Sequence, residues 1–521
     1  MRTFNVTGLC IPEEDYMVDI SGKIEQVRKL IDNRSYFTIN RARQYGKTTM
    51  LEALKRALID EYIVASLSFE GLGDESFASA PAFCKTFIKH MKKALDSSSI
   101  PDGITPEFVG SDICNFDMLS DHITAMCKNR KIVLLIDEVD KTSNNRVFLH
   151  FLSMLRNKFL ARKSGEDYTF HSVVLAGVYD IKNIKLKLIQ EGMYKPSEAE
   201  GNIYNSPWNI AADFTVDMSF SANEIASMLK EYENDYKTGM NITVISEEIY
   251  SYTSGYPFLV SRICQCIDGE PGKDWSRAGV QNAVKKLGIE KNTLFDDISK
   301  NLENNEKLYK LVYDILIVGN QRLFSINNPT VDLGVMYGII KEYNRNIYVS
   351  NKVFEMIICD YFISKDEESG RRPMGVLQYD VVRGGRFDME LCLRKFAEHY
   401  AEIFNGYDVE FLERHGRLLF LSYLKPLVNG QGFYHLESQF TDLRRMDIVV
   451  DFGQQQFIVE LKVWRGEQYQ EEAFKQLCGY LDSKNTNEGY LLTFDFRKTG
   501  NKRSTPNWLE IDGKCIFDVM V

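Results

Sequence analysis

The residues best suited to chemistry in the first third of the chain are Gly46, Lys47 and Thr48, which open an amphipathic helical pattern. A short strand pattern at residues 36–39 precedes them, so strand, loop and helix follow in that order. The unpaired N–H groups and positive dipole end of a helix N-terminus attract phosphate. A lysine there can pair with β- and γ-phosphates, and the neighbouring hydroxyl can ligate Mg²⁺. The pattern therefore predicts a phosphate-binding loop (P-loop).

A second motif lies downstream at residues 131–140, KIVLLIDEVD. Its apolar run has the composition of a buried parallel strand, and the strand ends in Asp137 and Glu138. Ligands of parallel α/β sheets bind at the carboxyl edge of the strands. We expect Asp137 to hold Mg²⁺, directly or through water, and Glu138 to polarise the attacking water. Together the two motifs predict binding of ATP or GTP.

One position departs from the general P-loop pattern. That pattern has glycine five residues before Gly46, where this chain has Arg41. A side chain at this position restricts the start of the loop. The alternative is a chance Gly-Lys-Thr at a helix start, and the preceding strand, the following helix and the second motif argue against it.

A different set of residues suits chemistry near the C-terminus. Residues 444–452 and 456–464 read as two strands joined by a turn, and a helical pattern follows. Alternate strand residues share a face, so Glu460 and Lys462 point the same way and Asp447 on the partner strand can reach them. Two carboxylates can hold Mg²⁺ beside a scissile phosphate, and the lysine can orient water or stabilise negative charge. This is the layout of a PD-(D/E)XK nuclease.

An upstream helical glutamate often completes such a site. Glu413 fits because a helical leucine pattern follows it, and Glu437 is its rival. The alternative reading is a surface hairpin with salt-bridged charges. The neighbours of Asp447, Glu460 and Lys462 are strongly apolar, however, and charges kept in such surroundings are usually paired or bind metal.

The composition is that of a globular protein with more than one domain. The 521 residues are 44% hydrophobic and 26% charged, which predicts two to four domains. The sequence holds no apolar stretch long enough for a bilayer, and acidic residues stand where a signal peptide has its apolar segment. The ten cysteines form no C-x-x-C pair, so reduced thiols are expected rather than a zinc site. We therefore expect a cytoplasmic protein.

The net charge of −10 gives no global attraction to nucleic acid. Binding of nucleic acid would have to use local basic patches, each of which can equally be solvated surface. The candidates are Arg371 and Arg372, Arg383 and Arg386, Arg444 and Arg445, and the basic residues of 497–503.

The order of patterns along the chain suggests four parts. Alternating strands and helices predict a parallel-sheet P-loop domain at 1–220, followed by a helical lid at 221–300. The lid contains a Gly-x-Pro turn that resembles the turn of signal-transduction-type P-loop ATPases, where it would approach the nucleotide near Pro257; an ordinary helix break is the alternative. A winged-helix-like region is expected at 301–365 and a nuclease-like domain at 366–521, with a charged linker at 364–372.

Residues 1 to about 300 resemble the AAA-ATPase-like family found in many anaerobic bacteria. The P-loop of that family carries arginine in place of the first glycine, then a basic segment and GK[ST], and residues 41–48 read RARQYGKT. From about residue 370 the chain resembles the PD-(D/E)XK domain usually fused to these ATPases. The matching residues are Asp447 in RRMD, Glu460 and Lys462 in VELKVWRG, and Gln476 in KQLCGYLD, with Glu413 as the helical glutamate.

The resemblance implies an α/β protein with an N-terminal P-loop NTPase sheet, a helical lid, a winged-helix-like region and a C-terminal restriction-endonuclease-like domain. It implies ATP and Mg²⁺ as cofactors, with Mg²⁺ or Mn²⁺ in the nuclease site. Residues expected to contact the nucleotide and its metal are Arg41, Gln44, Tyr45, Gly46, Lys47, Thr48, Thr49 and Asp137. Residues expected in the nuclease site are Glu413, Asp447, Glu460, Lys462 and Gln476, of which the three carboxylates would hold metal.

Two functions follow as expectations. The first is ATP-regulated, Mg²⁺-dependent cleavage of nucleic acid, DNA in the first place, in defence or mobile-element control. The second is an ATP-driven switch or scaffold whose nuclease fold binds nucleic acid without cutting it. The patterns predict no membrane partner and leave a homo-oligomer open.

Overall fold

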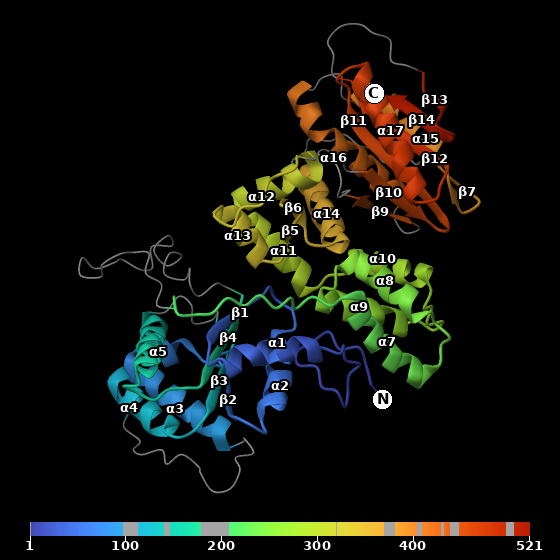
Figure 1. Ribbon diagram of the computed structural model, residues 1–521. Helices are drawn as coiled ribbons and strands as arrows, with labels where there is room; N and C mark the ends of the chain where they lie inside the picture. Colours follow the sequence, from blue (N-terminus) through green and yellow to red (C-terminus); the bar gives the residue numbers. More distant parts are fainter. Residues whose placement is uncertain are drawn as a thin grey trace. The chain divides into compact units, whose positions relative to one another are not determined.

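The computed structural model describes residues 2–96, 113–139, 146–178, 208–318, 320–368, 381–403, 409–428, 432–437, 447–495 and 505–521 (Figure 1). For residues 366–367, 399, 401–403, 409–415, 437 and 447 it describes the backbone alone. The chain divides into two compact units. The first comprises Met1–Ser246, Gly255–Gln265 and Met336–Gly338, and the second comprises Glu247–Ser254, Cys266–Val335 and Ile339–Val521.

The first unit is built on a four-stranded sheet in which all neighbouring strands are parallel. Its order is β1 (Tyr36–Asn40), β4 (Ser172–Gly177), β3 (Ile132–Asp137) and β2 (Ile63–Ser68). Every residue of β3 and β4 is buried, which explains why these strands read as continuous apolar runs. The predicted parallel α/β sheet of the P-loop domain is confirmed.

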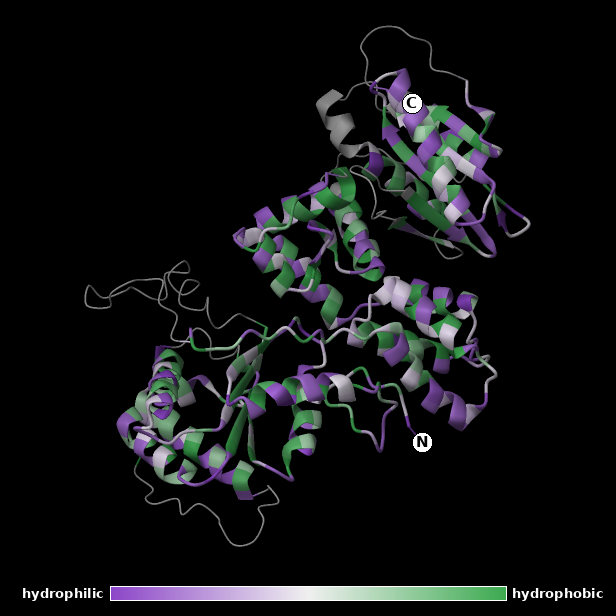
Figure 2. Ribbon diagram, viewed as in Figure 1, coloured by the Kyte–Doolittle hydropathy of each residue, from purple (hydrophilic) through white to green (hydrophobic). Residues whose placement is uncertain are grey.

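Helices cover both faces of this sheet (Figure 1). One face packs against α1 (Ser21–Asp32) and α2 (Lys47–Leu58), and the other packs against α3 (Ala80–Asp96), α4 (Phe116–Cys127) and α5 (Arg146–Ser164). The strands carry mostly hydrophobic residues, whereas hydrophilic residues gather on the outer sides of the helices (Figure 2). Burial on both faces fixes the strand ends, and the P-loop lies at one of those ends.

A segment at 208–220 leads from the sheet to the helices predicted to form a lid, which we call the lid helices. The Ala212 N–H donates to the Tyr36 carbonyl at 2.7 Å, so this segment, which we call the linker, lies along β1. It is followed by α7 (Ala222–Tyr236), α8 (Ile242–Thr253) and α9 (Pro257–Asp268). The chain is therefore attached to β1 at Ala212, ten residues before α7 begins.

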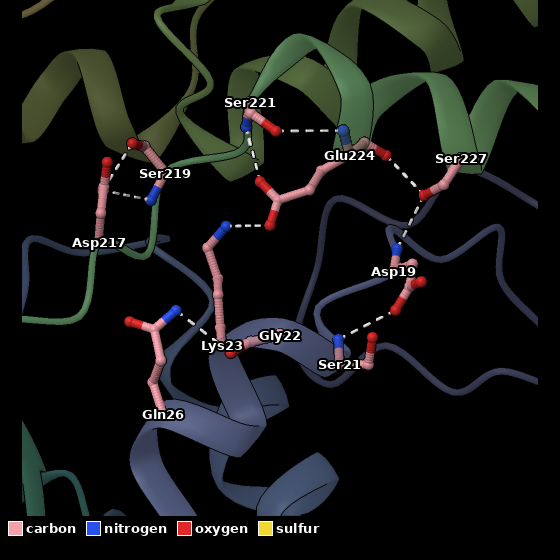
Figure 3. A network of polar contacts seen from close by, with 10 residues as sticks. All are labelled: Asp19, Ser21, Gly22, Lys23, Gln26, Asp217, Ser219, Ser221, Glu224 and Ser227. Carbon is pink, nitrogen blue, oxygen red and sulfur yellow. Dashed lines mark hydrogen bonds and ion pairs between the residues drawn. The ribbon is translucent and has the colours of Figure 1, made fainter.

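Polar contacts hold the start of α7 against α1 (Figure 3). Ser221 and Glu224 form a capping box, in which the Ser221 hydroxyl accepts from the Glu224 N–H at 3.2 Å and the Glu224 carboxylate accepts from the Ser221 N–H at 2.7 Å. The same carboxylate pairs with the Lys23 ammonium, and the Asp19 N–H donates to the Ser227 hydroxyl at 2.9 Å. The first turn of the lid is thereby tied to the helix that precedes the P-loop strand.

The second unit begins with helices and a small hairpin. Its elements are α10 (Arg277–Gly288), α11 (Thr293–Glu303), α12 (Glu306–Tyr313), a π-helical turn (Asp314–Val318), α13 (Pro329–Met336), β5 (Ile340–Tyr343), β6 (Asn346–Val349) and α14 (Lys352–Glu368). The antiparallel β5–β6 hairpin forms beside an isolated bridge between Leu323 and Asn346. This region thus combines helices with one antiparallel hairpin, and its winged-helix-like character stays a prediction.

A second connecting segment, the charged stretch 364–372, was predicted to lie between two domains, and this prediction is partly wrong. Helix α14 continues through Glu368, and residues 369–372 lie outside the described residues. The Lys365 ammonium pairs with Glu303 at 3.0 Å and with Glu368 at 3.3 Å. Ion pairs between residues three apart support a helix, so charge without apolar periodicity did not mark a break here.

The C-terminal part holds a six-stranded mixed sheet of order β13-β14-β12-β11-β10-β9. Its strands are β9 (Gly432–Glu437), β10 (Asp447–Phe452), β11 (Gln455–Val463), β12 (Glu488–Phe494), β13 (Asn507–Ile511) and β14 (Lys514–Met520). The other elements are β7 (Val382–Arg383), β8 (Arg386–Phe387), α15 (Met389–Ile403), α16 (Val409–Val428) and α17 (Glu467–Ser483). Helix α17 packs on one face over a core that includes Val449, Ile458 and Leu491.

Candidate functional site

The P-loop begins where β1 ends and finishes at the first turn of α2. Gln44 and Gly46 both have positive φ, at 55° and 75°. Gly46 is the residue before the helix, and glycine adopts this backbone conformation without a Cβ penalty. The loop thus turns tightly enough to point the first N–H groups of α2 toward the place where phosphate is expected.

The key side chains of the two N-terminal motifs meet in space. The Thr48 hydroxyl donates to the Asp137 carboxylate at 2.6 Å, although 89 residues separate them. The Lys47 ammonium donates to the Arg41 and Ala42 carbonyls, both at 3.0 Å, and Lys47 and Asp137 are buried. A hydroxyl and a carboxylate in contact beside a buried ammonium are the groups that Mg²⁺ and phosphate oxygens require.

Glu138 follows Asp137 at the end of β3. Its φ is 55°, a conformation that costs free energy for a residue with a side chain, and its N–H donates to the Asp137 carboxylate at 2.9 Å. The chain therefore turns sharply after the metal-ligand candidate. This turn places two successive carboxylates at the carboxyl edge of the sheet, as the sequence predicts.

Residues far away in the sequence complete the surroundings of the P-loop. The Tyr256 hydroxyl donates to the Arg43 carbonyl at 2.5 Å, and the Tyr256 and Tyr45 rings lie edge to face at 4.6 Å. A Cβ added to Gly46 would lie 4.0 Å from Pro257. The structure thus brings the predicted lid turn to the P-loop, whereas no sequence pattern had indicated the role of Tyr256.

Thr49 faces the N-terminal segment. Its hydroxyl accepts from the Cys10 N–H at 3.4 Å. An Asp15 carboxylate oxygen closes this segment into a loop by accepting from the Ile11 N–H at 2.8 Å and from Asn5 at 3.1 Å. The described contact of Thr49 is therefore with protein main chain, and its predicted contact with nucleotide stays a prediction.

The predicted nuclease residues lie on adjacent strands. In the antiparallel pair of β10 and β11, Asp447 is the register partner of Glu460, and Glu437 of β9 is the partner of Asp447 on the other side. Glu460 is 1% exposed, and the Lys462 ammonium pairs with it at 2.6 Å. The side chains of Asp447 and Glu437 lie outside the described residues, so the structure places their backbone alone.

Helix α16 carries Glu413, the predicted upstream glutamate, and Arg417 on the same helix shows how near this helix lies to Glu460. Glu413 lies on α16 one turn before Arg417, with its side chain outside the described residues. Burial lowers the pKa of Arg417 to about 10, and the negative charge of Glu460 opposes that shift. The Arg417 guanidinium also donates to the Leu316 and Ile317 carbonyls at 3.4 and 3.2 Å. The helix of Glu413 thus lies within electrostatic reach of Glu460.

A second polar group shares the sheet face of Glu460 and was missed by sequence reasoning. The Gln470 amide on α17 donates to the Asp518 carboxylate at 3.2 Å and accepts from the Thr493 hydroxyl at 3.3 Å. Thr493 is the register partner of Lys462. Gln476 is half-buried on the same helix, but its spacing from Gln470 turns it to another side. The glutamine that reaches the sheet is therefore Gln470, and the role of Gln476 stays a prediction.

We expect Asp518→Asn to stabilise the C-terminal part at pH 7 by about 2 kcal/mol, because burial raises the pKa of Asp518 to about 6. A carboxyl with a raised folded-state pKa is most favourable when protonated. Its contribution to stability is thus lost as pH rises from about 4 to about 6. Urea denaturation at pH 5 and pH 7 checks this, with the exposed Glu471→Gln as control. A gain that does not shrink on lowering the pH would contradict it.

The described part of the chain adds three further observations. Within it, no group of three or more His, Cys, Asp or Glu side chains is gathered as a metal cluster. All ten cysteines lie in it and none forms a disulfide. No helix found there has both the length and the apolar character needed to cross a membrane.

The chain is similar to known families and structures in two regions. The model of the AAA-like domain matches residues 16–362, and that of the PD-(D/E)XK nuclease superfamily matches residues 433–504. Among solved structures, a Walker-type ATPase of Pyrococcus abyssi is 12% identical with a TM-score of 0.47, covering 68% of this chain and 99% of its own. The Cdc6p protein of Pyrobaculum aerophilum is 12% identical with a TM-score of 0.33, covering 70% and 97%.

The ORC2 protein of Aeropyrum pernix, in ADPNP–ADP complexes, is 11% identical with a TM-score of 0.37, covering 70% of this chain and 98% of its own. No functionally curated protein matches the chain. The AAA-like model spans well over half of the residues and includes the P-loop, β3 and the lid helices. The chain accordingly belongs to the AAA-like domain family, and this ATPase-like domain is fused to a C-terminal PD-(D/E)XK nuclease-like domain.

Proposed function

We propose that the chain binds and hydrolyses ATP with Mg²⁺ at the P-loop. The observation that carries this proposal is the 2.6 Å contact between Thr48 and Asp137 beside the buried Lys47. In this assignment Lys47 pairs with the β- and γ-phosphates, Thr48 and Asp137 hold Mg²⁺, and Glu138 polarises the attacking water. Arg41, Gln44, Tyr45, Gly46 and Thr49 are proposed to shape the same loop.

The expected consequence for Glu138→Gln is ATP affinity within threefold of the wild type and a turnover about 100-fold lower. The substitution keeps the size of the side chain and removes its capacity to accept a proton. Calorimetric titration with ATP and a phosphate-release assay measure the two quantities. Glu61→Gln, at an exposed carboxylate paired with Arg28, is the control. Normal turnover in Glu138→Gln would show that another residue polarises the water.

We further propose that the C-terminal domain is a metal-dependent nuclease. Asp447, Glu460 and Glu413 would hold Mg²⁺ or Mn²⁺, and Lys462 would stabilise the charge that develops on the scissile phosphate. The supporting observations are the register of Asp447 with Glu460 and the burial of Glu460 against Lys462. A buried carboxylate is retained at a cost unless it is paired or binds metal. Gln476 is proposed as an accessory residue of this site.

The combined proposal is ATP-regulated DNA cleavage in defence or mobile-element control. The proposed parts are a P-loop domain at 1–220, a lid at 221–300, a winged-helix-like coupler at 301–365 and the nuclease domain at 366–521. A cytoplasmic location belongs to the proposal, since the cysteines form no disulfide. The alternative is an ATP-driven switch with a non-cleaving nuclease fold, favoured by the net charge of −10.

The decisive experiment is cleavage of plasmid and single-stranded DNA by the purified full chain, with Mg²⁺ or Mn²⁺, with and without ATP. Cleavage that requires metal supports the nuclease, and a change with ATP supports regulation. ATP hydrolysis without cleavage in any condition, including an RNA substrate, favours the non-cleaving switch. Gel filtration with and without ATP tests the open question of a homo-oligomer.

A further inference from the structure

Arg41 stands where the general P-loop pattern has glycine, and its guanidinium is engaged with protein. It donates to the Asn40 carbonyl and to the Val216 carbonyl of the linker, both at 2.8 Å. The guanidinium carbon also lies 5.3 Å from the centre of the Phe214 ring. A planar group with several donors can bind carbonyls and stack on an aromatic ring at the same time, which an ammonium cannot do.

The main chain of Arg41 makes two further contacts. Its N–H donates to the Gly177 carbonyl at the end of β4, at 3.1 Å, and its carbonyl accepts from the Lys47 ammonium at 3.0 Å. One residue therefore joins three places: the phosphate-binding lysine, the neighbouring strand and the linker at Val216. A glycine at this position would keep the main-chain contacts and lose the contact with the linker.

The linker is also bonded to the predicted lid turn at its other end. The Phe220 N–H donates to the Gly255 carbonyl at 2.8 Å, and Gly255 has a φ of 72°. A Cβ on Gly255 would lie 1.9 Å from the Phe220 carbonyl oxygen, so only glycine permits this approach. The next residue, Tyr256, donates to the Arg43 carbonyl. P-loop, linker and lid turn thus form a closed circuit of contacts.

We propose that Arg41 is a positioning residue that couples phosphate binding at Lys47 to the linker and, through it, to the lid. In the structure the Lys47 ammonium donates to the carbonyls of Arg41 and Ala42. Phosphate oxygens compete for the N–H groups of the Lys47 ammonium. Phosphate binding therefore weakens the hydrogen bond between this ammonium and the Arg41 carbonyl. A shift of the Arg41 main chain alters the hydrogen bond between the Arg41 guanidinium and the Val216 carbonyl of the linker. The inference rests on nucleotide binding at the P-loop and adds a route from that site to the lid.

The test is hydrogen–deuterium exchange of the full chain, with and without ATP and Mg²⁺. The reporters are linker peptides that contain the Ala212 and Phe220 amides, which donate to Tyr36 and Gly255. In the wild type we expect ATP to change exchange in these peptides. In Arg41→Ala, compared at saturating ATP so that any change in affinity is compensated, we expect the ATP-dependent change in the linker to be lost. Arg41→Lys should restore little of it, because one ammonium does not replace the stacked guanidinium.

Two comparisons separate this inference from nucleotide binding itself. Lys47→Ala should lose both ATP binding and the linker response, whereas Arg56→Ala, at an exposed arginine of α2, should keep both. Phe214→Leu removes the ring under the Arg41 guanidinium and should weaken the linker response to ATP without removing a charge. This variant replaces Arg41→Ala in the test if Arg41→Ala fails to fold. An unchanged linker response in folded Arg41→Ala overturns the inference. Loss of ATP binding in that variant also overturns it and assigns Arg41 to the nucleotide.

Discussion

Lys47→Ala is expected to weaken ATP binding at least 100-fold, a loss of about 3 kcal/mol or more. The Lys47 ammonium is buried, and its hydrogen bonds to the Arg41 and Ala42 carbonyls hold it in the P-loop before nucleotide binds. Charge-assisted contacts to phosphate are among the stronger polar interactions, and alanine removes all of them. Isothermal titration with ATP in Mg²⁺ measures the change.

The matched control is Lys55→Ala, two turns further along α2. Lys55 is partly exposed and lies 3.8 Å from Glu52, an ion pair that contributes little to stability. Its loss should leave ATP affinity unchanged, and circular dichroism should show the same helix content in both variants. Affinity of Lys47→Ala within threefold of the wild type would mean that the nucleotide binds elsewhere, and the P-loop assignment would be abandoned.

The parts of the fold with strong local patterns could be predicted from the sequence. Strand β3 is a run of buried residues ending in Asp137, and α2 follows Gly46 with helical periodicity, so each motif reveals its own element. The strand pair β10–β11 was also predictable, because Glu460 and Lys462 alternate with apolar residues. Local periodicity is sufficient to predict a site residue where the helix or strand that carries the residue also shows a clear pattern of its own.

Contacts between distant segments could not be predicted in the same way. Arg41 looked like an irregular P-loop residue, and its partner Val216 lies 175 residues away in a segment that reads as extended but shows no sign of a contact with the P-loop. Tyr256 and Gln470 reach their sites through the packing of whole helices, which no local pattern encodes. The charged end of α14 was misread partly for the same reason, since the ion pair of Lys365 with Glu303 is a tertiary contact, and partly because the local pair of Lys365 with Glu368 supports a helix.

Glu460→Gln is expected to reduce metal-dependent DNA cleavage by about 1000-fold or more. The change keeps the shape of a side chain that is 1% exposed, so packing is preserved, and it removes the negative charge that would bind the metal. It also leaves the Lys462 ammonium without its ion-pair partner at 2.6 Å. Cleavage of supercoiled plasmid in Mn²⁺, followed over time, measures the rate.

Three controls make this result specific. Glu471→Gln changes an exposed carboxylate on α17 and should cleave like the wild type, which excludes a general effect of lost charge. Mn²⁺ titration without nucleotide should show one site lost in Glu460→Gln, and ATP hydrolysis should be unchanged because the P-loop keeps all its residues. Lys462→Met should cleave as poorly while still binding Mn²⁺, since the lysine acts on the phosphate rather than the metal. Cleavage that persists in Glu460→Gln would mean that β10 and β11 do not form the metal site, whatever their resemblance to a nuclease.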